Sequence, residues 1–90
     1  MFLLSPPVVR EAEVFTRMPA KFRKPEVQTD WARANRGGQA TDSFLEGPVW
    51  SPDSQGHGCL YVTDIPHGRI FRISAAGDWE LVAEYDGEPN

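Results

Sequence analysis

The sequence predicts an all-β protein built around an antiparallel meander, and three apolar segments about ten residues apart carry this prediction. The segments span residues 60–64, 69–73 and 79–85, and each is rich in β-branched or aromatic residues. Turn-type sequences, PHG and AAGD, separate them. Residues 44–50 are expected to add one further strand on a neighbouring sheet. We therefore treat residues 44–90 as the folded β region.

Residues 1–43 are predicted to form a mostly irregular leader, because prolines interrupt its early elements. One short strand is expected at Ala12–Thr16. One short helix is expected at Thr29–Asn35, whose first two side chains can accept hydrogen bonds from the free N–H groups of its first turn. Gly37 and Gly38 supply the left-handed residue that ends a helix. The leader has no core of its own and is expected to pack on another part of the protein.

The composition excludes several classes of protein. The 90 residues carry a net charge of −4, and nucleic-acid binders usually present a basic face, so we expect no nucleic-acid partner. The basic run Lys21–Lys24 is either a phosphate-binding patch or, as is more usual, a solvated loop. No segment is long and apolar enough to span a membrane.

Signals for export and for disulfide bonds are also lacking. The apolar start, Met1–Leu4, has no basic flank and stops at prolines, so it does not resemble a secretory signal, and a cytoplasmic location is expected. A single cysteine, Cys59, excludes an internal disulfide framework. Because Cys59 begins an apolar run, it is expected to be a buried and inert thiol.

An isolated meander leaves two sheet edges unpaired and one face uncovered. Antiparallel folds avoid this by closing into barrels or by repeating radially as propeller blades. Nothing in the sequence closes the sheet, and the final residues, DGEPN, are of turn type. The sequence is therefore expected to be part of a larger protein.

The run FLEGPVW contains the residue that most clearly indicates chemistry. Glu46 precedes Gly47 and Pro48; glycine permits close approach of a ligand, and proline fixes the backbone so that the carboxylate is aimed. A hard cation such as Ca²⁺ prefers rigidly placed oxygen ligands. Taken alone, these residues leave Glu46 open between a metal ligand and an ordinary carboxylate at the end of a strand.

Several motifs together resemble one family. EGPVW, LYVTDI, GRIFRI and the final DGEPN resemble the family that contains gluconolactonase, senescence marker protein and luciferin-regenerating enzyme. The leader run DWARANRGG, leading into DSFLEGP, looks like the start of bacterial members. This resemblance implies a six-bladed β-propeller with a divalent cation at the top of its central channel. Residues 44–90 would form about one blade, and the leader would pack outside it or help to close the ring.

The resemblance also implies the chemistry. Glu46 would be a metal ligand, and Asn90 would bind the metal or contact the substrate. The cation would be Ca²⁺, with Zn²⁺ or Mg²⁺ as alternatives, and it would assist hydrolysis of a sugar lactone. The remaining ligands and the general base, a late aspartate, are expected beyond residue 90. No catalytic residue is therefore assigned within this chain, which is expected to be inactive alone.

Two other functions remain open from the sequence. The chain could belong to a non-catalytic propeller that serves as a binding module, because a fold does not fix a function. It could instead be a small interaction protein that pairs through an exposed sheet edge. His57 and His67 are interpreted as solvated turn residues, and Asp64 as a turn cap. Three aromatic side chains are interpreted as packing anchors: Trp31, Trp50 and Trp79.

Overall fold

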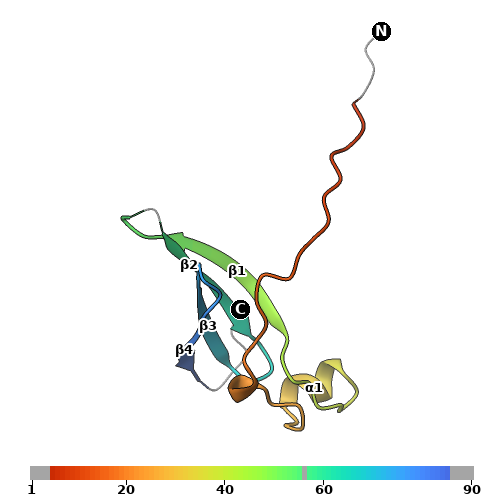
Figure 1. The fold of residues 1–90 in the computed structure, drawn as a ribbon. Coiled ribbons are helices and arrows are strands. Elements are labelled where there is room, and N and C mark those ends of the chain that lie inside the picture. Colours follow the sequence, from red (N-terminus) through yellow and green to blue (C-terminus); the bar gives the residue numbers. More distant parts are fainter. Residues whose placement is uncertain (1–4, 56, 86–90) are drawn as a thin grey trace.

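The protein forms one open, four-stranded antiparallel sheet preceded by a long leader (Figure 1). A computed structural model describes residues 5–55 and 57–85. The strands pair in sequence order, as β1 (Leu45–Pro52), β2 (Gly58–Asp64), β3 (Arg69–Ser74) and β4 (Trp79–Glu84). The leader contains a 3-10 helix, η1 (Ala20–Phe22), and a short α-helix, α1 (Asp30–Asn35). The predicted meander of three strands is confirmed.

Strand β1 belongs to the same sheet as β2, so the prediction that it joins a neighbouring sheet is wrong. It is an edge strand, and its sequence suits an edge because Pro48 and Pro52 cannot donate to a ladder. The pairing with β2 is interrupted between Glu46 and Val49. Gly47 lies there with a φ of 63°, a conformation that favours glycine.

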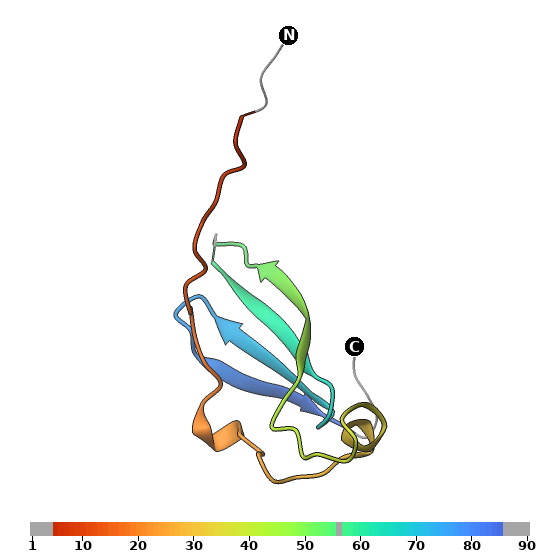
Figure 2. The ribbon, with the colours of Figure 1, turned by 90° about the vertical axis from the view of Figure 1, so that its right-hand side faces the viewer.

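The leader crosses one face of the sheet without joining a ladder. The strand predicted at Ala12–Thr16 is wrong, because the chain there is extended but pairs with no strand. Val14 and Phe15 are mostly exposed, so the apolar character of this run does not reflect a buried strand. Figure 2 shows the first part of the leader running away from the sheet and the later part passing beside β3 and β4.

The core lies between the leader and the sheet. On alternating positions of β2 and β3, Val62, Phe71 and Ile73 are buried. The ring of Phe22, from η1, packs edge-on against Phe71 with a centroid distance of 5.0 Å. The leader therefore completes the core of the sheet, and four partly buried side chains surround it: Met18, Phe22, Leu60 and Trp79.

Helix α1 forms where the sequence predicts it. The hydroxyl of Thr29 accepts from the Ala32 N–H at 3.1 Å and caps the first turn. Gly37 and Gly38 follow with positive φ values, as expected beyond the end of a helix. None of the helices in residues 5–55 and 57–85 is long and apolar enough to cross a membrane.

The three tryptophans have different environments. Trp31 of α1 packs against Phe44 at 5.1 Å, and the ring of Trp79 packs edge-on against the core phenylalanine Phe71. The ring of Trp50 lies across Gly58, where a Cβ atom would come within 2.7 Å of it, but half of this side chain is exposed. The packing role is thus confirmed for Trp31 and Trp79 and only partly for Trp50.

The sheet face opposite the leader is less apolar. Tyr61, Arg72 and Glu80 occupy one row across β2, β3 and β4, and Arg72 forms an ion pair with Glu80. Cys59 lies two residues before Tyr61, on the same face. Its side chain is half-buried rather than buried, because no described segment covers this face.

We predict that replacing Phe22 by alanine lowers the free energy of unfolding by about 1–3 kcal/mol, because apolar contact with the core is lost. Urea unfolding followed by circular dichroism measures this change. The matched control is Phe15→Ala, at a leader position that is 61% exposed, and it should change stability by less than about 0.5 kcal/mol. Equal losses for the two variants would show that η1 does not pack on the sheet.

Candidate metal ligand and the polar network beside it

Glu46 lies at the open edge of the sheet. It is the second residue of β1, directly opposite Thr63 of β2. The Thr63 hydroxyl donates to the Glu46 carbonyl oxygen at 2.9 Å, which fixes the backbone just before Gly47 and Pro48. The Glu46 side chain is exposed to solvent. The carboxylate is therefore held by a defined backbone but is free to meet a solute.

Asn90, the other predicted ligand, lies outside the described residues. The end of β4 and the start of β1 are nevertheless at the same end of the sheet. The register shows this, because Leu45 pairs with Asp64, Asp64 with Arg69, and Arg69 with Glu84. The chain therefore leaves β4 at the end of the sheet that carries Glu46.

The described residues supply few ligands for a metal ion. Within residues 5–55 and 57–85, no group of three or more His, Cys, Asp or Glu side chains is placed to hold one. A single carboxylate provides one or two of the six to eight oxygens that Ca²⁺ takes. His57 is exposed, and the Nε2 atom of His67 lies 2.8 Å from the carbonyl oxygen of Thr41. Within the described residues, Glu46 therefore has no partner ligands, and its role as a metal ligand stays a prediction.

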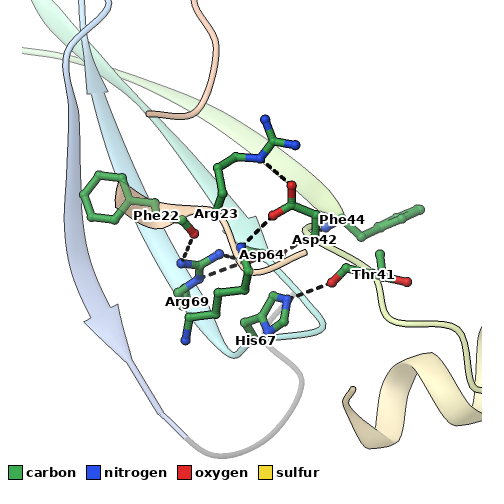
Figure 3. A network of polar contacts seen from close by, with 9 residues as sticks. Phe22, Arg23, Thr41, Asp42, Phe44, Asp64, His67 and Arg69 are labelled. Carbon is green, nitrogen blue, oxygen red and sulfur yellow. Dashed lines mark hydrogen bonds and ion pairs between the residues drawn. The ribbon is translucent and has the colours of Figure 1, made fainter. Parts of the chain in front are cut away.

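A buried ion pair lies beside the start of β1 (Figure 3). Oδ2 of Asp64 accepts from Nε and Nη2 of Arg69, at 2.9 and 2.6 Å. Oδ1 of Asp64 accepts from the Phe44 N–H at 2.9 Å. Nη1 of Arg69 donates to the Phe22 carbonyl oxygen at 2.7 Å. Both side chains are almost fully buried, so this pair joins the leader, the start of β1 and the β2–β3 turn.

A more exposed group of contacts lies next to this pair. Asp42 accepts from the Lys24 N–H at 2.7 Å and pairs with the Arg23 side chain. Burial alone would raise the pKa of Asp42, but the hydrogen bond from Lys24 and the charge of Arg23 outweigh it. The pKa of Asp42 is therefore lowered from its ordinary value of 3.8. This cluster joins two parts of the leader, the segment that follows η1 and the segment between α1 and β1.

The sequence interpretation missed the ion pair. The sequence predicts a turn cap at Asp64 and assigns no role to Arg69; in the structure, Asp64 instead bonds to Arg69 and to the Phe44 N–H. His67 was expected to be solvated, but its side chain is half-buried because it contacts Thr41. One signal for the pair was present: an acid ends one strand, and a base begins the next across a short turn.

Comparison with known proteins identifies no relative from which roles could be transferred. The chain matches no family model, no curated protein and no solved structure. The interpretation of Glu46 therefore depends on the geometry above and on the motifs in the sequence.

We predict that Asp64→Asn lowers the free energy of unfolding by about 3–5 kcal/mol, because it leaves the Arg69 charge buried without a counter-charge. Asparagine keeps the size of the side chain and can still accept from the Phe44 N–H, so the loss reports the charge together with the two Arg69 hydrogen bonds to Oδ2. Chemical denaturation of the two proteins measures it.

The matched control breaks the exposed pair on the other face of the sheet. Glu80→Gln removes the partner of Arg72, whose side chain is 37% exposed, and should change stability by at most about 1 kcal/mol. If Asp64→Asn were as mild as Glu80→Gln, the pair would not fix the three segments.

We predict that the stabilising effect of Asp42 depends on pH. The pKa of Asp42 is lowered on folding, so its ionised form contributes stability that is fully present above its ordinary value of 3.8. This contribution is lost as the pH falls below 3.8 through the folded-state pKa. The Asp42→Asn variant should thus be less stable than the parent at pH 6, and the difference should narrow below pH 3.8. Denaturant midpoints measured across this range test it, and a constant difference would contradict it.

Proposed function

We propose that this chain forms one blade of a six-bladed propeller of the gluconolactonase-like family. The whole protein would hydrolyse sugar lactones with the help of a bound divalent cation. Ca²⁺ is the cation that we favour. The four-stranded antiparallel sheet, with its strands in sequence order, supports this proposal because propeller blades are sheets of this kind. The combination of EGPVW, LYVTDI and GRIFRI in the same chain supports the choice of family.

The observation that carries the proposal is the position of Glu46. In a propeller the blades surround a central channel, so an edge strand of each sheet faces the axis. Glu46 lies on such an edge strand, is exposed, and precedes Gly47 with its positive φ. A carboxylate in the middle of the sheet, or one paired with a neighbouring base, would not suit a ligand at the axis.

The uncovered face of the sheet also supports a neighbouring blade on that side. The leader covers one face, and no described residue covers the other. Val49 on β1 is 59% exposed, and Val82 on β4 is 46% exposed. In a ring of blades, such side chains would pack against a neighbouring sheet, and their burial would contribute to stability.

The residues of this chain would have limited roles in the reaction. When bound, the cation supplies a Lewis acid that polarises the lactone carbonyl. Glu46 provides negative charge and oxygen ligands, and it transfers no proton. Thr63 and Gly47 fix the backbone that presents its carboxylate. Asn90 would add an amide oxygen to the cation or a hydrogen bond to the substrate, and the general base would come from another blade.

We predict that Glu46→Gln, in a protein that carries this blade within a closed ring, weakens cation binding and lactone hydrolysis together, each by at least about tenfold. A neutral amide oxygen attracts a divalent cation less strongly than a carboxylate does. Calorimetry with Ca²⁺ and a lactone-opening assay measure the two effects. The matched control is Glu84→Gln, an exposed glutamate on the opposite edge strand, which should alter neither.

Unchanged hydrolysis in Glu46→Gln would exclude the metal-ligand role. Cation binding without any lactone hydrolysis in the parent protein would favour the non-catalytic binding module instead. The 90-residue chain alone serves as a negative control, because Glu46 and Asn90 together supply too few oxygens to bind Ca²⁺ with micromolar affinity.

A further inference from the structure

A cleft of about 350 Å³ lies between the leader and the sheet, and Glu46 is not among the residues that line it. Small-molecule sites begin at about this size, with volumes of roughly 300–1,000 Å³. The leader segment 16–18 forms one wall, and the segment that leads into β1 forms the opposite wall. Six lining residues carry the argument: Thr16, Arg17, Met18, Arg23, Leu45 and Trp79.

The apolar part of the cleft has a fixed aromatic ring. The indole N–H of Trp79 donates to the Thr16 hydroxyl oxygen at 3.0 Å, and that hydroxyl donates to the Gly77 carbonyl oxygen at 2.8 Å. These bonds set the orientation of the indole ring. Met18 and the 40% exposed side chain of Leu45 add apolar surface beside it. A flat apolar ligand would therefore find a preformed surface here.

The charge of the cleft comes from the leader. Arg23 and Asp42 both line the cleft as well, and as an ion pair they balance each other's charge (Figure 3). Arg17 is exposed, and among the described residues it makes no ion pair. The leader segment 17–24 contains four basic residues and no acidic one, in a chain whose net charge is −4. Arg17 is thus a cation at the cleft with no counter-charge among the described residues.

We propose that this cleft binds a small organic anion, with a planar apolar body against Trp79 and a carboxylate paired with Arg17. A guanidinium group matches the two oxygens of a carboxylate, and the indole face favours a flat ring. Inorganic phosphate would leave the apolar surface of Met18 and Leu45 exposed to water. This site is independent of the lactonase proposal, since it uses neither Glu46 nor Asn90.

Titration of the ¹⁵N-labelled 90-residue chain with benzoate tests the proposal. The indole resonance of Trp79, assigned with a Trp79→Phe variant, should shift saturably, with a dissociation constant in the millimolar range expected of so small a ligand. Benzyl alcohol, which has the ring without the charge, should bind at least fivefold more weakly. Inorganic phosphate, which has charge without a ring, should also bind at least fivefold more weakly.

Matched arginine variants complete the test. Arg17→Gln should weaken benzoate binding at least fivefold, whereas Arg36→Gln, at an exposed position after α1, should leave it unchanged. The absence of a saturable shift in the Trp79 indole resonance would overturn the proposal. So would equal binding of benzyl alcohol or of phosphate, or an Arg17→Gln variant that binds benzoate as the parent does.

Discussion

Asp64 and Arg69 form a buried ion pair that holds the leader, the residue before β1 and the β2–β3 turn together. Both groups are removed from water, so each must find partners inside the protein. Asp64 accepts hydrogen bonds through both of its oxygens, from Arg69 and from the Phe44 N–H. Arg69 donates through three nitrogen atoms, to Asp64 and to the Phe22 carbonyl oxygen. A buried ion pair adds little net stability compared with apolar side chains of similar volume. Removing one partner, however, strongly lowers the stability because the other charge stays buried. We interpret it as selecting one arrangement of leader and sheet.

This constraint reaches both proposed sites. Phe44, which is held by Asp64, is two residues before Glu46, so the pair fixes where β1 begins. Phe22, which is held by Arg69, closes the core and determines how the leader crosses the sheet. The wall of the cleft at Arg17 depends on that crossing. The proposed metal ligand and the proposed anion site therefore both depend on the same buried pair.

Local patterns in the sequence predicted those elements that local physics determines. The alternating strands, the helix and its Thr29 cap depend on residues close together in the chain, and the structure has them. The apolar run at Ala12–Thr16 was misread because apolar content does not supply a partner strand. The contacts that position the leader join residues far apart: Phe22 with Arg69, and Thr16 with Trp79. No local pattern encodes such pairings.

Less of the candidate site can be compared with the sequence, and the metal-ligand role of Glu46 stays a prediction. The Gly-Pro sequence indicated that Glu46 would be held by a defined backbone, and Gly47 indeed has a positive φ. The membership of β1 in the same sheet as β2 was missed, although Pro48 and Pro52 were consistent with an edge.

Pro48 and Pro52 carry no amide hydrogen, and this affects what can pair with β1. A strand from another molecule that paired with β1 would lack two N–H donors and would meet an irregular ladder. This edge of the sheet therefore disfavours pairing with a polypeptide, while small solutes can still reach the Glu46 carboxylate.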